Sequence, residues 1–240
     1  MGRLTYEEQL GRLRMDYRVA SELNNAAVSV EAYRSPEDLK QRQNPITDEA
    51  DGHLAAHYLV HYHIKTLAGV GEFSSLTVVH YDLLANGNYP YSVPGCWVIS
   101  EPMPWSPHFR VGAPVCVGEI WEEAKGKILL GHLILHVARL LNFDEVARGG
   151  GYVGWNAEAI HYWREQLQLQ PITPSLVLPP MPLDKTHGLT FSKAMPGFKA
   201  KGSTASATNA GGAGFKPRGQ IGGSGTFNGA RGFARRTGGH

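Results

Sequence analysis

The sequence predicts an α+β domain followed by a long tail of different composition. Three observations predict this arrangement. Apolar residues recur with helical spacing near the N-terminus, short alternating segments fill residues 27–100, and a second helical repeat covers residues 128–141. The chain of 240 residues is 42% hydrophobic and 18% charged, so it is long and apolar enough to bury a core.

The first predicted element is an amphipathic helix over residues 4–24. Thr5 and Glu8 have the spacing of a capping box, in which the two residues satisfy each other's backbone N–H groups. An apolar stripe with helical spacing follows: Tyr6, Leu10, Leu13 and Tyr17.

Four short strands are predicted next, each bounded by turn signals and joined by links short enough for an antiparallel meander. Their ranges are 27–34, 57–65, 73–84 and 95–100. The first two strands alternate apolar and polar side chains, so each is expected to have one solvated face. A polar loop over residues 35–52 and a turn at Gly69 and Gly71 separate the first three strands.

Two helices, over residues 128–141 and 154–169, complete the predicted domain. The first is the longest apolar stretch in the chain, but it is too short to span a bilayer and is interrupted by His132 and His136. No membrane anchor is therefore predicted.

Five histidines raise the alternative of a metal site. His57, His61 and His63 share one face of a predicted strand, and His132 and His136 stand at positions i and i+4 of a predicted helix. The helix pair lacks the glutamate of an HExxH motif and is assigned to the polar face, and the strand trio fits the solvated side of a sheet. We predict no metal and no cofactor.

The two cysteines differ in their setting. Cys96 lies in a predicted strand, whereas Cys116 stands in "GAPVCVGEIW" (112–121) between two glycines. Free cysteine usually packs in a core, so burial is the first interpretation and a nucleophile on a loop is the second. No charged and then apolar leader follows Met1, and both cysteines are therefore predicted to be free thiols in a reducing cytoplasm.

The glycines around Cys116 favour the nucleophile. A residue that carries an acyl group needs a thiolate to accept it and room for two macromolecules. Gly112 and Gly118 allow backbone conformations that a residue with a Cβ disfavours, so amides can turn toward a developing oxyanion.

Three segments carry a family resemblance. "NYPYSVP" (88–94) is similar to a Tyr-Pro-x-x-Pro-Pro stretch, Ser106-Pro107-His108 follows it, and "GAPVCVG" (112–118) comes before the long apolar helix. In this order and spacing, roughly residues 3–169 resemble the ubiquitin-conjugating enzyme family, and most of all its diverged prokaryotic members.

The resemblance implies both a fold and an activity. The fold is an N-terminal helix, a four-stranded antiparallel meander, a cysteine-bearing loop and two C-terminal helices. The activity is the transfer of a ubiquitin-like protein, carried as a thioester on Cys116. An adenylating activating enzyme is the implied donor, and a lysine or another amine is the implied acceptor.

Two further residues are candidate catalytic groups. His108 stands where most members of the family have the asparagine of His-Pro-Asn, and a histidine there is expected to donate a hydrogen bond to the oxyanion. Asp144 and Glu145 follow the central helix, where acids near the incoming amine lower the cost of its deprotonation. The alternatives are a loop histidine without a role and solvated acids.

Two other functions remain open from the sequence. A non-catalytic binding module of the same fold would keep the sheet but would not need an exposed thiol. A cysteine protease would pair Cys116 with one of the histidines, but nothing in the sequence identifies the third member of such a triad.

Charge divides the chain into two parts. Residues 1–185 carry 15 basic and 21 acidic residues, whereas residues 186–240 carry eight basic residues and no acid. We expect a conjugating domain over residues 1–170 and a proline-rich linker or surface strap over residues 171–185. Residues 186–240, rich in glycine, are expected to form a disordered tail.

The tail has two interpretations. A solubilising linker needs no partner, whereas Arg-Gly pairs with interspersed phenylalanines suit weak, salt-sensitive contact with a polyanion such as nucleic acid or with an acidic partner.

Overall fold

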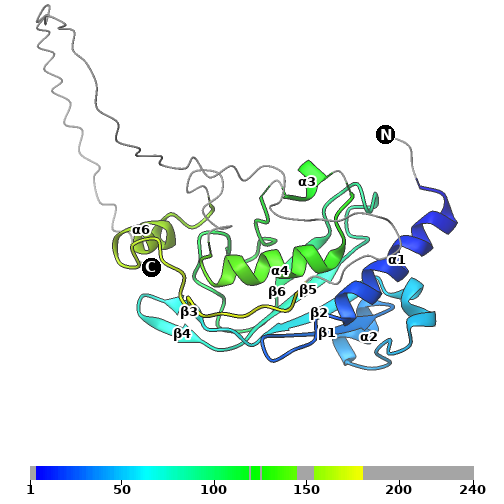
Figure 1. The fold of residues 1–240 in the computed structure, drawn as a ribbon, viewed down its shortest axis with the longest axis horizontal. Coiled ribbons are helices and arrows are strands. Elements are labelled where there is room, and N and C mark those ends of the chain that lie inside the picture. Colours follow the sequence, from blue (N-terminus) through cyan, green and yellow to red (C-terminus); the bar gives the residue numbers. More distant parts are fainter. Residues whose placement is uncertain (1–3, 119, 125, 145–153, 181–240) are drawn as a thin grey trace, which may run out of the picture. The chain divides into compact units, whose positions relative to one another are not determined.

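The structure, a computed structural model, describes residues 4–118, 120–124, 126–144 and 154–180. The chain divides into two units, Met1–Phe198 and Lys199–His240, and all the described residues belong to the first. In that unit a four-stranded antiparallel sheet is combined with several helices (Figure 1), which confirms the predicted α+β class.

Helix α1 (Tyr6–Ser21) begins with the predicted capping box. The Oγ1 atom of Thr5 accepts the N–H of Glu8, and the Glu8 carboxylate accepts the N–H of Thr5 at 2.8 Å. Leu13 and Tyr17 are buried as the stripe predicted, but Tyr6 is 72% exposed. The expectation for Tyr6 was wrong because the first turn of α1 extends beyond the sheet (Figure 1).

The predicted meander is present, with strand order β1-β2-β5-β6 and every neighbouring pair antiparallel. Val60 of β2 stands opposite Val30 of β1 on one side and Val79 of β5 on the other. The strands are β1 (Val28–Tyr33), β2 (His57–Tyr62), β5 (Thr77–Asp82) and β6 (Gly95–Val98).

A second, two-stranded sheet was not predicted. Strands β3 (Thr66–Gly69) and β4 (Glu72–Ser74) form a hairpin between β2 and β5. Gly71 turns this hairpin with a φ of 74°, a conformation that favours glycine. The predicted strands 57–65 and 73–84 were too long because their apolar residues continue into the hairpin.

The predicted polar loop 35–52 contains two short helices, α2 (Pro36–Gln41) and η1 (Glu49–Leu54). Ser35 caps α2 by accepting the N–H of Asp38. Leu39 of α2 packs in a cluster on the sheet with Tyr33, Leu59 and Val78.

This packing corrects the expectation of a solvated face on the first two strands. Because a cluster that includes Leu59 covers that face, His57 is only 7% exposed. His61 is half-buried, and His63 is the exposed member of the predicted trio.

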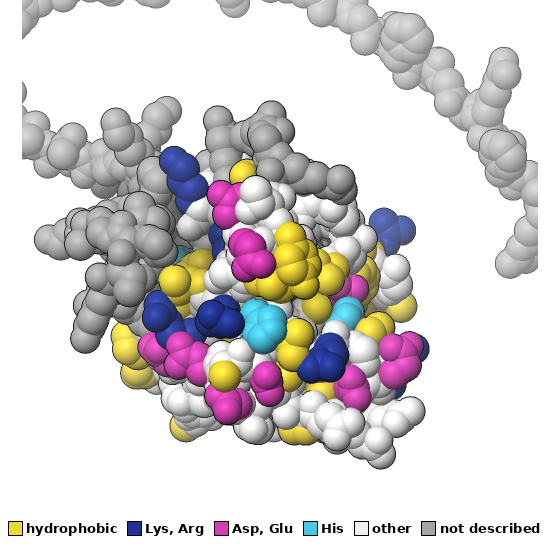
Figure 2. Space-filling view, turned by 90° about the vertical axis from the view of Figure 1, so that its right-hand side faces the viewer, with side chains coloured by type: hydrophobic (Ala, Val, Ile, Leu, Met, Phe, Trp, Pro, Cys, Tyr) yellow, Lys and Arg dark blue, Asp and Glu magenta, His cyan; other side chains and the backbone are white. Residues whose placement is uncertain are grey.

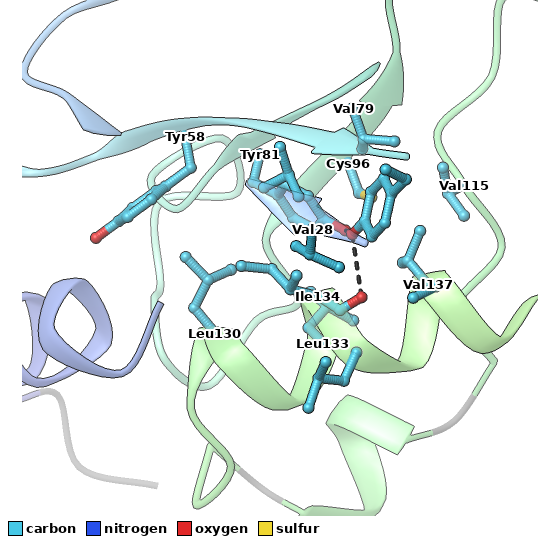
Figure 3. Close-up of a cluster of buried hydrophobic side chains, with 14 of the residues drawn as sticks. Val28, Tyr58, Val79, Tyr81, Cys96, Val115, Leu130, Leu133, Ile134 and Val137 are labelled. Atoms are coloured by element: carbon cyan, nitrogen blue, oxygen red, sulfur yellow. Dashed lines mark hydrogen bonds between the residues drawn. The ribbon is translucent and has the colours of Figure 1, made fainter. Parts of the chain in front are cut away.

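The main core lies between the sheet and helix α4 (Leu130–Leu141), as Figures 1 and 3 show. Tyr62 reaches from the sheet to α4 and donates its hydroxyl to the carbonyl of Ile134 at 3.0 Å. Helices α3 (Ile120–Ala124) and α6 (Ala157–Glu165) follow the cysteine-bearing segment and α4, respectively.

Helix α4 has no wholly polar face, and the placement of its histidines on such a face was wrong. His136 is buried and His132 is half-buried, because other segments pack around the helix. The histidines therefore belong to the core region of the domain rather than to its solvated surface.

The described part of the proline-rich segment lies against the domain. The N–H of Ile172 donates to the Asn142 carbonyl at 2.9 Å, and the Asn142 side chain exchanges two hydrogen bonds with the backbone of Thr173. Leu176 and Leu178 also pack on the core. These contacts favour the surface strap over the free linker. The predicted tail, residues 186–240, lies outside the described residues.

The surface at the end of the molecule that holds α1 and α2 mixes acidic and basic side chains (Figure 2). The excess of acid predicted for the domain is therefore not gathered into an area of one sign on this face. Among the described residues, no helix has the length and apolar character that crossing a membrane requires.

Candidate functional site

The two cysteines are both free thiols, and the structure gives them different environments. Cys96, on β6, is 2% exposed, and burial raises the pKa of its thiol far above the ordinary value. Figure 3 shows its sulfur between the sheet and α4, with Val79 and Val115 close by. Cys116, by contrast, is half-buried on a loop. Of the two cysteines, Cys116 is therefore the one that is partly exposed to solvent.

The loop that carries Cys116 is held at three consecutive residues. The N–H of Val115 donates to the Cys96 carbonyl at 2.7 Å, and the N–H of Cys116 donates to the His108 carbonyl at 2.9 Å. The Nε2 atom of His136 lies 3.1 Å from the Val117 carbonyl. The cysteine is thereby attached to β6, to the segment around His108 and to α4.

Glycines with left-handed backbone flank the loop as the sequence predicts. Gly112 has a φ of 73° and Gly118 a φ of 65°, and a Cβ added at either position would meet no atom within 4 Å. The space around both glycines is therefore open, and the positive φ is the feature that favours glycine at these positions.

His108 contacts the cysteine-bearing loop through its backbone carbonyl, which accepts the N–H of Cys116. It is 6% exposed, and its position is set by neighbouring backbone contacts, because the carbonyl of Pro107 accepts the N–H of Trp155 at 2.8 Å. The same Pro107 carbonyl leaves no room for a Cβ at Gly154. The start of α6 thus packs tightly on this segment and holds His108 in place.

His136 is the residue of this site that sequence reasoning missed. Burial, and then the nearby charge of His108, lowers the pKa of His136 to about 4, so its imidazole is neutral at neutral pH. A carbonyl can only accept a hydrogen bond, so the single ring proton lies on Nε2 and points at Val117. The signal available in the sequence was the apolar neighbours of His136, Leu135 and Val137, which predict burial.

Asp144 is placed at the far end of α4, three residues after the helix ends. Its N–H donates to the carbonyl of Arg139 at 3.0 Å. Asp144 therefore lies against the last turn of α4. A backbone hydrogen bond joins His108 to Cys116, whereas the position described for Asp144 is at the C-terminal end of α4. Glu145 lies outside the described residues.

A surface pocket of about 590 Å³ adjoins the segment that follows His108. Its walls come from that segment, from the residues before it and from the start of α6, and they are mostly apolar with one base and one acid. Lining residues include Trp105, Phe109, Arg110, Val111, Trp155 and Glu158. The pocket thus adjoins residues 109–111, which directly precede the cysteine-bearing loop.

The strand histidines interact with one another on the sheet. The Nδ1 atom of His57 lies 3.4 Å from Nε2 of His80 and 3.8 Å from the carboxylate of Asp82. In the described segments, no group of three or more histidine, cysteine, aspartate or glutamate side chains is placed to hold a metal ion.

Comparison with models of known protein families finds none that matches this chain, and comparison with curated proteins also finds no match.

Proposed function

We propose that this protein is a ubiquitin-conjugating-type acyl transferase, which accepts a ubiquitin-like modifier as a thioester on Cys116 and transfers it to an amine. The observation that carries the proposal is the contrast between the two thiols. Cys116 is partly exposed on a loop held by three hydrogen bonds, whereas Cys96 is buried and its thiol pKa is raised.

The reaction has two acyl transfers. An adenylating activating enzyme supplies the modifier with an activated C-terminal carbonyl, and the Cys116 thiolate attacks that carbon, forming an S–C bond as the donor's leaving group departs. The target amine then attacks the same carbon, so that a C–N bond forms, the C–S bond breaks and the amine proton passes to a base. Cys116 is returned as a thiolate.

His108 and Asp144 have supporting roles in this proposal. His108, whose backbone carbonyl accepts the N–H of Cys116, is proposed to donate a hydrogen bond from its side chain as the carbonyl oxygen gains charge. Asp144 is proposed to favour deprotonation of the incoming amine.

The architecture also supports the proposal. The N-terminal helix, the antiparallel meander and the long helix packed on it follow the order that the resemblance implies. The pocket beside the loop offers a contact surface for a second macromolecule. Two free thiols fit the reducing cytoplasm expected from the sequence.

The direct test is a charging assay with a candidate activating enzyme, its ubiquitin-like modifier and ATP. The protein should gain the mass of the modifier, and a reducing agent should remove it. Cys116→Ala should abolish this mass shift while Cys96→Ala retains it. A shift that persists in Cys116→Ala would overturn the mechanism.

Native alkylation separates the enzyme from a non-catalytic module of the same fold. Iodoacetamide should modify Cys116 in the folded protein at least about 100-fold faster than Cys96, because a buried thiol with a raised pKa presents almost no thiolate. Peptide mapping by mass spectrometry measures both rates. Similar rates at the two cysteines would contradict the proposal.

A further inference from the structure

His136 is an unfavourable residue for its position unless it has a specific task. It is 5% exposed, and within the described residues its Nδ1 atom has no hydrogen-bond partner. A buried nitrogen without a partner loses its hydration and gains nothing in return. Leucine fills a similar volume without this cost, so packing alone does not explain the imidazole.

The one hydrogen bond that His136 makes fixes a peptide unit next to the cysteine. Its Nε2–H donates to the carbonyl of Val117 at 3.1 Å. In a trans peptide unit the C=O and the following N–H point in opposite directions. Because the Val117 carbonyl points toward His136 in α4, the N–H of Gly118 must point away from that helix.

Two of the amides near the thiol are already engaged. The N–H of Val115 donates to Cys96, and the N–H of Cys116 donates to His108. No hydrogen bond within the described part of the chain uses the N–H of Val117 or that of Gly118. Val117 is buried, whereas Gly118 is exposed, with open space around its Cα.

We propose that His136 is a positioning residue, which holds the Val117 carbonyl and thereby aims the N–H of Gly118 at the acyl oxygen of a thioester on Cys116. This inference rests on the proposed function, because it assigns an oxyanion donor for that reaction. When a thiolate or an amine attacks the acyl carbon, the carbonyl oxygen becomes an oxyanion, and a donor that is already oriented stabilises it. The amide of Cys116 cannot serve, since the His108 carbonyl occupies it.

Two small reagents test this inference without an identified partner. Iodoacetamide alkylates a thiolate by displacement at a saturated carbon, so no oxyanion forms. A small thioester, N-acetylglycine joined to mercaptoethanesulfonate, acylates the same thiolate through an oxyanion. The ratio of the acylation rate to the alkylation rate at Cys116 therefore reports oxyanion stabilisation and cancels changes in thiolate fraction and access.

The ratio is measured for the full chain by intact mass and peptide mapping, with N-acetylcysteine as the reference thiol. Wild type should exceed the reference. His136→Leu should lower the ratio by about tenfold, less than the loss caused by removing a donor outright, because the amide stays but is no longer held. His136→Gln, which retains a side-chain N–H, should stay within about twofold of wild type.

The matched control is His132→Leu, one turn earlier in α4, which should leave the ratio unchanged because the hydrogen bond that His132 accepts comes from the N–H of Leu129, at the start of α4, and not from the cysteine-bearing loop. Circular dichroism verifies folding, and if His136→Leu fails to fold, His136→Met replaces it, since methionine also lacks the donor.

Each outcome tests a different claim about His136, the loop or the proposed function. If His136→Leu keeps the wild-type ratio, His136 is not a positioning residue, while acyl transfer on Cys116 still stands. If wild type only equals N-acetylcysteine, there is no oxyanion site at the loop. If the ratio behaves as expected but the charging assay fails, the oxyanion site at Cys116 is supported and the proposed conjugating function is refuted.

Discussion

Asp16→Ala is expected to be among the most destabilising substitutions in the domain. The Asp16 carboxylate is fully buried and accepts three hydrogen bonds. The donors are Nε of Arg12 at 2.7 Å, the hydroxyl of Tyr89 at 2.5 Å and the N–H of Leu130 at 2.7 Å. It therefore joins α1 to the Tyr-Pro segment and to the first residue of α4.

Two consequences of removing the Asp16 carboxylate determine how much stability is lost. Burial lowers the pKa of Arg12, but the negative charge of Asp16 and the contact with Tyr89 outweigh it and leave that pKa above its ordinary value. The guanidinium therefore stays charged and would be left in the core without its counterion, a loss of about 3–5 kcal/mol. The first N–H of α4 would also lose its acceptor, since Leu129, at the cap position, has no side chain that can serve.

We expect Asp16→Ala to lower the free energy of unfolding by about 4 kcal/mol. In urea denaturation, with a slope of about 2 kcal/mol per molar, the midpoint should fall by about 2 M. The melting temperature should fall by roughly 8–16 °C for a domain of this size.

Two variants make the measurement specific. Asp16→Asn should cost less, because its amide oxygen still accepts the N–H of Leu130 although it no longer balances Arg12. Glu7→Ala, an exposed acid on the same helix, should change stability by less than about 0.5 kcal/mol. A loss below about 1 kcal/mol for Asp16→Ala would refute this account of the network.

Further predictions concern acid stability, catalysis and the chain beyond the domain. The pKa of His136 is about 4 in the folded state and about 6.5 in the unfolded state, so the unfolded state binds a proton first as the pH falls. The free energy of unfolding should therefore be highest above pH 6.5 and fall by up to about 3 kcal/mol between pH 6.5 and 4. Urea midpoints that stay constant over this range, or a pH dependence that is unchanged in His136→Leu, would contradict this prediction. His108→Ala should slow transfer from the thioester to an amine by about 10²-fold in single-turnover assays and affect charging less, whereas equal transfer rates would leave His108 without a role. Truncation after Lys185 should leave a folded protein that still forms the thioester but has lost salt-dependent binding to polyanions. Truncation after Gln170 should in addition lower the melting temperature by several degrees, because the hydrogen bonds to Asn142 are lost. Equal melting temperatures of the two truncated forms would show that the strap contributes no stability.

Local patterns were sufficient for the main elements of the fold. The Thr5–Glu8 capping box predicted the start of α1, alternation and turn signals predicted the four strands of the meander, and helical spacing predicted α4. Each of these signals lies within one segment, where neighbouring residues determine which side chains share a face.

The short elements and the burial of side chains were not predictable in the same way. Helix α2 and strands β3 and β4 have too few residues for a period to appear. His57 alternates as a solvated residue would, but packing on that face of the sheet, which includes Leu39 from α2, keeps it from solvent. Burial of this kind depends on a segment that the pattern of the strand does not contain.

The sequence by itself determined the loop, the glycines that flank it and Cys116 as the candidate nucleophile, because residue type and local spacing carry that information. Only the tertiary structure decided that Cys96 is inaccessible, that His136 holds the peptide after Val117, and that Asp16 supports the start of α4 from 114 residues away. The physical reason is that a buried polar group takes its role from its hydrogen-bond partners, and in these cases the partners are brought close only when distant segments pack together.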